Sequence, residues 1–308
     1  MHQLTYIKSM QNNYHTKFIL SPVLNILKET VTACTGIGDG IETQSLSEYV
    51  LQTTFLKMTG ASEQKLKCIC WEIATYDYDY RYRYLKKNYG ECSRYEDKNS
   101  IYSDLRAIIL KTDDSFSVSS IFDDLDITGK INEHIDNNIT KAIKNQEKKT
   151  KKKLSEENKE KMMKGMRDYY TRKGLCENEK SILKRQVLQE KIHCKIIDIL
   201  NNSSLVIWEQ HDYEFYKVEW KKMLSMNYAT NELFDNNLQE YYRTIVYNHR
   251  NRCAHNLTSY QNNLPTLRTI VEKSFDYENY FFRFALLVLL DEVFMRLYNA
   301  YLISTENV

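Results

Sequence analysis

Residues 278–302 read ENYFFRFALLVLLDEVFMRLYNAYL and contain neither proline nor glycine. From Tyr280 to Leu290 apolar side chains occupy most sides of a helix, whereas a helix at a protein surface is apolar along one stripe only. A helix that is apolar nearly all round needs neighbours on every side, which is the central position of a helical bundle. This segment therefore predicts a bundle built around residues 278–302.

The composition extends this prediction to the whole chain. The 308 residues include only 2 prolines and 8 glycines, the residues that most strongly mark turns. Long helices joined by polar loops are therefore expected, and the predicted fold class is all-α. An apolar content of 42% excludes disorder throughout and suffices for one large core or two modest ones.

Periodicity and helix-start signals predict further helices. Ser45 and Glu48 have the spacing of a capping box, so a helix should begin at Ser45 and end near Gly60. The next helix is expected from Ser62 to about Tyr89. A loop is predicted at residues 112–120, and further helices at 100–110, at 177–200 and around Trp208, Phe215, Trp220 and Leu224.

The run YDYDYRYRY at residues 76–84 alternates tyrosine with charge, a pattern typical of a strand. A helix is nevertheless favoured, because Asp77 precedes Arg81 by four residues and the next acidic and basic residues repeat this spacing. In a strand each pair would be roughly 13 Å apart. Tyr76, Tyr80 and Tyr84 are expected to continue the apolar stripe of the preceding residues, so that the run packs on the core with a solvated rim. The alternative is that RNA bases stack on its tyrosines and arginines.

Positive charge is concentrated in one segment. Residues 141–173 contain 13 Lys and Arg against 5 Asp and Glu, and the formal net charge of +2 leaves about −6 for the remainder. A loop is expected here, followed by a charged helix with Ser155 at its start. The segment is interpreted either as a solvated insertion or as an RNA-backbone contact. The RNA-binding candidates in it are Lys149, Lys151, Lys152 and Lys153.

The seven cysteines predict free thiols in a reducing cytosol, because they are odd in number, scattered and without a CxxC pair. Cys68 and Cys70 could hold a metal together with Cys92, but no histidine lies at ligand spacing, so no metal site is expected. A secretory signal is not supported. The longest apolar run, residues 284–290, is too short to cross a bilayer. A cytoplasmic protein without membrane partners is predicted.

The most specific chemical signal is Arg250-Asn251-Arg252-Cys253-Ala254-His255. A guanidinium can hold a phosphate through forked hydrogen bonds, and an imidazole can carry a proton near neutral pH. This pair suits phosphodiester chemistry without a metal ion. Arg250, Asn251 and His255 are therefore the candidate catalytic residues, and Arg252 is a further candidate for RNA contact.

The motif is expected near the end of a helix that begins near Thr230 with Glu232 in its first turn. Arg250 and His255 are five positions apart, about 140° around a regular helix, so one straight helix does not bring them together. Three explanations could close this gap: the length of the arginine side chain, a bend of the helix near Asn256, or a second copy of the chain across a two-fold interface. The second copy explains best why so few residues could form a site. The predicted buried face comprises Leu238, Tyr241, Tyr242, Ile245 and His249.

A second pair, Arg243 and His249, has a similar spacing. His249 lies on the predicted apolar stripe, where a core histidine is the simpler interpretation. Asn251 and His255 instead fall on the opposite side of the helix, one turn apart. The later pair, Arg250 and His255, is therefore preferred.

The pattern Arg250-Asn251-x-x-x-His255 resembles the R-x4–6-H motif of the HEPN superfamily, the higher eukaryotes and prokaryotes nucleotide-binding domains. A polar residue directly after the arginine is also typical of that family. The resemblance extends over residues 230–301. It implies a HEPN-like helical bundle at residues 176–308, with a basic loop-helix insertion at 141–175 and additional N-terminal helices at 1–140, some of which could pack into the same bundle.

The resemblance also implies a function. HEPN proteins of this type dimerise so that two motifs form one composite endoribonuclease site, which uses no metal or cofactor and leaves a 2′,3′-cyclic phosphate and a 5′-hydroxyl. Many act in toxin–antitoxin or anti-phage defence systems, which implies an antitoxin or sensor partner. The alternatives are a non-catalytic HEPN-like module that binds RNA, a nucleotide or a protein, and a helical interaction protein with no nucleic-acid role.

Overall fold

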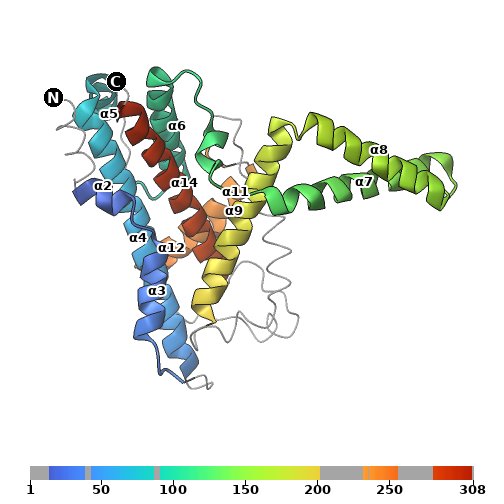
Figure 1. Ribbon diagram of the computed structural model, residues 1–308. Coiled ribbons are helices and arrows are strands. Elements are labelled where there is room, and N and C mark those ends of the chain that lie inside the picture. Colours follow the sequence, from blue (N-terminus) through green and yellow to red (C-terminus); the bar gives the residue numbers. More distant parts are fainter. Residues whose placement is uncertain are drawn as a thin grey trace. The chain divides into compact units, whose positions relative to one another are not determined.

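The computed structural model describes residues 14–38, 43–86, 91–201, 232–234, 236–255 and 280–306. These residues are predominantly helical and include no strand, which confirms the all-α fold (Figure 1). They form two compact units, one from residues 1–121 with 191–308 and the other from residues 122–190. The smaller unit contains the whole basic segment and extends beyond it on both sides.

The larger unit contains most of the helices. They are α2 (Tyr14–Ile19), α3 (Leu24–Ala33), α4 (Gln44–Tyr76), α5 (Tyr78–Lys86), α6 (Tyr95–Thr112), α11 (Asn236–Tyr241), the π-helical segment η5 (Tyr242–Tyr247), α12 (Asn248–His255) and α14 (Tyr280–Glu306). A short 3-10 helix, η2 (Val118–Phe122), begins inside the stretch expected to be a loop. In the part of the chain that is described, no helix is long and apolar enough to cross a membrane.

Helix α14 is the core helix that the sequence predicts. Every side chain from Tyr280 to Asp291 is buried, and the helix packs against α4 and α6. The burial includes a charged pair, because Nζ of Lys65 on α4 lies 2.5 Å from Oδ1 of Asp291. The backbone N–H of Val23 donates to the other carboxylate oxygen at 2.8 Å. Asp291 therefore links α14 both to α4 and to the turn before α3.

The predicted helix start at Ser45 is confirmed to within one residue, because α4 begins at Gln44, but the predicted end near Gly60 is wrong, because α4 continues to Tyr76 as one helix of 33 residues. A glycine inside a helix costs only about 1 kcal/mol relative to alanine. Phe55 and Met58 before Gly60 and Leu66 after it are fully or almost fully buried. Apolar burial on both sides of the glycine outweighs that cost and keeps the helix continuous.

The helix expected to run to about Tyr89 instead breaks at Asp77, whose backbone is extended. The Asp77 carboxylate accepts a hydrogen bond from the backbone N–H of Tyr80 at 2.8 Å, so it caps the start of α5. Residues 78–84 are helical, which confirms that the tyrosine run is not a strand. The expected pairing with Arg81 is wrong, because Asp77 pairs with Lys111 at 3.2 Å and Arg81 donates to backbone carbonyls.

The smaller unit contains a hairpin of two helices, α7 (Thr128–Thr150) and α8 (Glu156–Lys173), followed by the first part of α9 (Glu177–Leu200). Figure 1 shows α7 and α8 side by side. Asn138 donates to the hydroxyl of Tyr170 at 3.1 Å, and Arg167 pairs with Asp136 at 2.8 Å. The predicted helix starts after Ser155 and Cys176 are confirmed.

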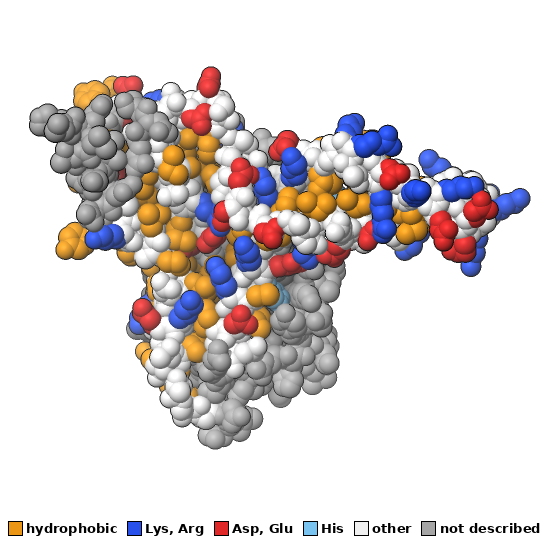
Figure 2. All heavy atoms as spheres, in the orientation of Figure 1, with side chains coloured by type: hydrophobic (Ala, Val, Ile, Leu, Met, Phe, Trp, Pro, Cys, Tyr) orange, Lys and Arg blue, Asp and Glu red, His pale blue; other side chains and the backbone are white. Residues whose placement is uncertain are grey.

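The lysine-rich turn lies at the end of this hairpin. Lys149 belongs to the last turn of α7, so the prediction of a loop at this residue is wrong. Lys151 ends the helix in the left-handed conformation, with φ of 53°. Lys148, Lys149, Lys151, Lys152 and Lys153 are all exposed. Figure 2 shows many lysine and arginine side chains, interspersed with acidic ones, along the hairpin and at its end.

Candidate functional site

The helix that carries Arg250 and His255 starts later than predicted. Its expected first residue, Thr230, and the helix expected around residues 208–224 lie outside the described residues. Glu232 lies in a bend, and α11 begins at Asn236, so the predicted helical first turn is wrong. The reason is tertiary: two backbone N–H groups of this bend, those of Leu233 and Phe234, donate to side chains of α6, namely Asn99 at 2.7 Å and Tyr95 at 3.2 Å.

The predicted apolar stripe is confirmed at four positions. Leu238, Tyr242, Ile245 and His249 are buried, whereas Tyr241 is half-buried. His249 is a core histidine, as predicted, because its Nε2 lies 3.3 Å from both the hydroxyl of Tyr280 and the Sγ of Cys253. It is also in aromatic contact with Phe55 of α4.

A π-helical segment that the periodicity did not predict lies directly before the motif. The backbone N–H of Asn248 donates to the carbonyl of Arg243, five residues back, which is the hydrogen bond that defines a π turn. Such wide turns are rare and often lie at functional sites. Here η5 lies within the buried stripe, because Tyr242 and Ile245 belong to it and the stripe continues to His249.

Arg250 lies on α12, which packs against α4, and a quarter of its side chain is exposed. Its Nη2 lies 3.3 Å from the carboxylate of Glu63, and its Nη1 donates to Oδ1 of Asn251, also at 3.3 Å. Glu63 comes from the middle of α4 and is only 13% exposed. No sequence motif identifies Glu63, because its partner is 187 residues away.

The same network continues to a second arginine. Hydrogen bonds from Asn251 and from Arg94 lower the pKa of Tyr247, the last residue of η5. Arg94 is exposed and directly precedes α6. Hydrogen bonds thus join Glu63 of α4 to Arg250 and Asn251 of α12, and Tyr247 and Arg94 lie close to Asn251 and to Tyr247 respectively, at the end of η5 and the start of α6. We call this group the arginine network: Glu63, Arg250, Asn251, Tyr247 and Arg94.

A buried lysine lies beneath the arginine network. The side chain of Lys98 on α6 is 1% exposed, and its ammonium group donates to the carbonyl of Cys92. Burial lowers the pKa of Lys98 to about 8, although attraction to Glu63 opposes this effect. The same ammonium group lies 5.5 Å from the ring centroid of Tyr242. Lys98 is buried and cannot contact a substrate, so it can affect the site only through its charge.

The other predicted RNA-contacting residues are placed differently. Arg252 and His255 belong to α12, but their side chains lie outside the part of the structure that is described. The four lysines Lys149, Lys151, Lys152 and Lys153 belong to the smaller unit, whereas Arg250 belongs to the larger one. The structure therefore brings together Arg250 and Asn251 and adds three residues, Glu63, Tyr247 and Arg94, that the sequence did not indicate.

The contacts of the alternative arginine, Arg243, are those of a residue that holds two helices together. It pairs with Glu96 of α6 at 2.9 Å, and its guanidinium lies 5.2 Å from the ring centroid of Tyr95. These contacts fix the start of α6 against η5. They agree with the preference for Arg250 over Arg243 as the chemical group.

Metal-binding groups were not found in the described ranges, where no cluster of three histidine, cysteine or acidic side chains lies close enough to hold an ion. All seven cysteines are free, as predicted. Burial raises the pKa of the Cys92 thiol to about 11 and also raises the pKa of Cys68. These thiols are therefore protonated near neutral pH, which makes them weak nucleophiles.

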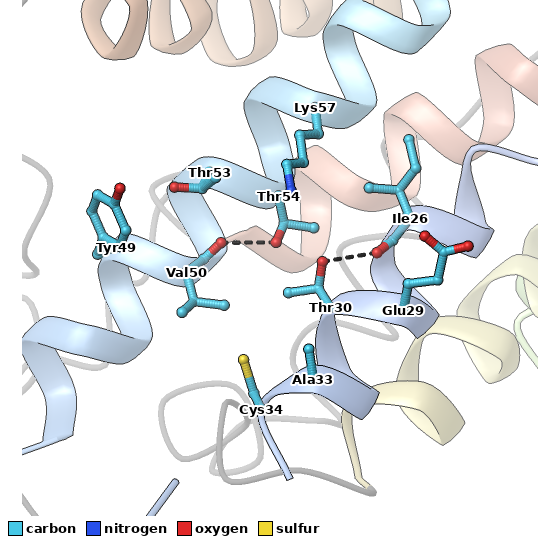
Figure 3. Close-up of a pocket in the computed structure, with 10 residues that line it drawn as sticks. All are labelled: Ile26, Glu29, Thr30, Ala33, Cys34, Tyr49, Val50, Thr53, Thr54 and Lys57. Carbon is cyan, nitrogen blue, oxygen red and sulfur yellow. Dashed lines mark hydrogen bonds between the residues drawn. The ribbon is translucent and has the colours of Figure 1, made fainter.

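A separate open pocket of 540 Å³ lies between α3 and α4 (Figure 3). Two of its three threonine hydroxyls donate to carbonyls of their own helices: Thr30 to Ile26 and Thr54 to Val50, each at 2.8 Å. The remaining wall is largely apolar, and no set of polar groups converges on one point. This pocket therefore lacks the features of a catalytic site.

No protein family, curated protein or solved structure matches this chain. Its function must be inferred from its own residues and their geometry.

Proposed function

We propose that this chain is a metal-independent endoribonuclease of the HEPN type, with Arg250, Asn251 and His255 as its catalytic residues. The observation that carries the proposal is the state of Arg250, whose side chain is partly exposed and whose guanidinium is held by Glu63 and Asn251. An oriented and accessible guanidinium is what phosphate recognition requires.

The proposed reaction is an internal transfer of the phosphodiester. The 2′-oxygen of the RNA attacks the neighbouring phosphorus, a new O2′–P bond forms, and the P–O5′ bond breaks. One proton leaves the 2′-hydroxyl and another is delivered to the 5′-oxygen, and His255 acts as general base or general acid in one of these transfers. Arg250 stabilises the negative charge of the pentacovalent transition state. The products are a 2′,3′-cyclic phosphate and a 5′-hydroxyl.

A two-fold dimer completes the proposed site. Positions 250 and 255 are about 140° apart on the regular helix α12, so one copy of the helix does not present both to one phosphate. Two copies related by a two-fold axis would supply two arginines and two histidines. The second histidine would then be available for the second proton transfer.

The basic hairpin is proposed to collect RNA rather than to cut it. Its exposed lysines, Lys149 and Lys151 to Lys153 among them, lie close together at the turn between α7 and α8. Such a cluster attracts a polyanion independently of its sequence. This part of the proposal depends on charge alone.

A second candidate function is a non-catalytic module that binds RNA, a nucleotide or a protein. It is favoured by the Glu63 carboxylate, which already neutralises part of the charge of Arg250. In that case Arg250 would grip a phosphate, or a carboxylate of a protein partner, without any reaction. Both candidates predict binding, but only the first predicts cleavage.

The experiment that tests the proposal is an RNA cleavage assay in excess EDTA. The wild type is compared with Arg250→Ala, Arg250→Lys, His255→Ala and the control Arg83→Ala, an exposed arginine on α5. We expect cleavage by the wild type and by the control only. End-group analysis should find a cyclic phosphate, and DNA of the same sequence should remain intact because it lacks the 2′-hydroxyl.

Two results would overturn the proposal. If EDTA abolishes cleavage, the reaction depends on a metal. If the wild type and His255→Ala leave structured and unstructured RNA equally intact while both bind it, the binding module is the correct function.

A further inference from the structure

The tyrosines of α5 lie on two sides of the helix. Tyr80 is 1% exposed and Tyr84 is half-buried, and their rings stack with 5.8 Å between the centroids. Tyr78 and Tyr82, two residues away from them along the chain, are 75% and 56% exposed. The first pair therefore packs on the protein, whereas the second pair is available to a partner.

The exposed rings belong to a continuous face of the helix. Leu85, which is 78% exposed, follows Tyr82 by three residues, and Tyr82 follows Tyr78 by four, so the three side chains are neighbours on the helix surface. Single exposed apolar residues are common on proteins, but adjacent ones form a patch of the kind that marks a binding surface. We call this patch the tyrosine face: Tyr78, Tyr82 and Leu85.

Contacts at the start of α5 hold the tyrosine face in place. Arg81 donates to the carbonyls of Ala74 at 2.6 Å and Thr75 at 2.9 Å, which attaches α5 to the last turn of α4. Asp77, which caps α5, also pairs with Lys111 of α6. The rings are thus presented by an anchored helix, which lowers the entropic cost of stacking a ligand on them.

Positive charge borders the tyrosine face. Nζ of Lys86 lies 4.2 Å from the ring centroid of Tyr82. At about 100° per residue, Lys86 and Arg81 flank the face on its two sides. Asp79 and Arg83 lie one turn apart on the adjoining side of α5, and their opposite charges offset each other. The face is therefore apolar at its centre and positive at its margins.

A second copy of the chain does not suit this face. A two-fold contact sets each patch against itself, so it would bring the cations at the margins together. A single strand of RNA does suit it, because unpaired bases stack on aromatic rings whatever their sequence and the phosphates attract the cations. The bases of a duplex are already stacked on one another and cannot stack on side chains in this way.

We propose that the tyrosine face of α5 stacks the bases of single-stranded RNA, so that the substrate of this chain is RNA with unpaired bases. This assignment rests on the proposed function and specifies the class of RNA on which it acts. Tyr78 and Tyr82 are one turn apart, about 6 Å along the helix axis, and hold neighbouring bases of one strand. Lys86 meets the phosphate beside the base that stacks on Tyr82.

The test measures RNA binding by the full-length His255→Ala protein, so that cleavage does not interfere. A fluorescein-labelled 12-nucleotide RNA without internal structure is titrated in EDTA, once as a single strand and once annealed to its complement. Tyr78→Ala and Tyr82→Ala should each weaken binding of the single strand by at least about fivefold, because the stacking of one base is lost. The salt dependence of Kd should stay the same, because no charge is removed.

Matched variants separate stacking from other effects. Tyr49→Ala removes a 65% exposed tyrosine from the other end of α4 and should leave Kd unchanged. Tyr82→Trp keeps an aromatic ring and should retain full affinity. Lys86→Ala should reduce the slope of log Kd against log salt by about 0.7, the loss of one phosphate contact, whereas Lys57→Ala removes an exposed lysine of α4 and should not. Thermal unfolding of each variant establishes that the protein tested is folded.

Three results would overturn the stacking site. The first is that both alanine variants bind the single strand as tightly as the His255→Ala protein does, or that this protein binds no RNA. The second is that they weaken binding of the duplex to the same extent. The third is that they leave RNA binding intact but break up an oligomer in sedimentation, which would make the face an interface between copies.

Failure of the proposed function gives a different result. A wild type that binds single strands through Tyr78 and Tyr82 but never cleaves them would retain the stacking site and remove the nuclease. Cleavage that proceeds equally well without the two tyrosines, with unchanged Kd, would retain the nuclease and remove the stacking site.

Discussion

The carboxylate of Glu63 on α4 lies 3.3 Å from the guanidinium of Arg250 on α12. This pair joins two helices that are far apart in the sequence, and it sets the direction in which Arg250 faces its surroundings. Because Glu63 is largely buried and Arg250 is only partly exposed, solvent screens the pair less than it would a surface pair. Glu63 is thus a positioning residue of the proposed site.

Glu63→Ala is expected to lower kcat of RNA cleavage by about 10- to 100-fold with a smaller change in KM, because a misdirected Arg250 stabilises the transition state less well. Glu63→Gln retains an acceptor oxygen and should recover part of the activity. The measurement is steady-state cleavage of a labelled RNA, normalised to folded protein.

The control for Glu63 is Glu72→Gln, which removes a buried carboxylate from the same helix. Glu72 pairs with His15 at 2.6 Å, away from the arginine network. The Glu72→Gln substitution should change the free energy of unfolding without changing the rate of RNA cleavage per folded molecule. Equal loss of activity in the Glu63 and Glu72 variants would show that Glu63 acts only through the fold.

Because the pKa of Lys98 is lowered, the free energy of unfolding should increase with pH. Its pKa is lowered from 10.5 to about 8 in the folded protein, so between these values the unfolded chain binds more protons than the folded one. The free energy of unfolding should therefore rise from about pH 8 to about pH 10.5, by up to about 1.4 kcal/mol per pH unit. Urea unfolding at pH 7.5, 8.5 and 9.5 measures this slope.

Lys98→Met isolates the contribution of the lysine, because other groups also titrate in this range. Burial raises the pKa of Cys92 to about 11, so the folded protein keeps a thiol proton that the unfolded chain loses as the pH rises above the thiol's ordinary pKa. The contribution of Cys92 to the free energy of unfolding therefore falls in this range. The difference between wild type and Lys98→Met cancels this background. A difference that is constant from pH 7.5 to 9.5 would contradict the assignment.

The basic turn of the hairpin should contribute to RNA affinity through charge. Replacing Lys151, Lys152 and Lys153 with alanine should reduce the salt slope of RNA binding by about 2, at about 0.7 for each phosphate contact with a single strand. Fluorescence anisotropy at 50 to 300 mM salt measures it. The matched control replaces three lysines of the same unit that already pair with carboxylates, namely Lys130, Lys159 and Lys161.

The two triple variants carry the same change in net charge, so only the location of the charge differs. The control should change the slope much less, because its lysines are already neutralised locally. Equal slopes in both triple variants would indicate a diffuse effect of net charge and no site at the turn.

Gly60→Ala should stabilise the protein by about 1 kcal/mol, because alanine has the higher helix propensity and restricts the unfolded chain. A Cβ built at Gly60 meets no atom within 4 Å, so the substitution needs no rearrangement. Urea unfolding at pH 7 gives the change in free energy. A destabilised variant would mean that the backbone at this position is approached by another group.

The sequence by itself determined the helical class, the central helix and the buried face of the motif helix. These features depend on local periodicity: the apolar stretch from Tyr280 to Leu290 has no polar side to expose to water, and His249 falls on an apolar stripe. The sequence also proposed Arg250 and Asn251 as site residues, because a guanidinium and a neighbouring amide form a compact chemical pattern, and the two side chains are hydrogen-bonded to each other.

Only the tertiary structure decided the continuity of α4 through Gly60, the π turn before the motif and the membership of the arginine network. Whether a glycine ends a helix depends on what its flanking residues can bury, and here they bury against other helices. Glu63 and Arg94 carry no local pattern that relates them to Arg250. Their contacts form only when α4 and the start of α6 pack against η5 and α12, because an ion pair or hydrogen bond depends on distance in space and not on separation along the chain.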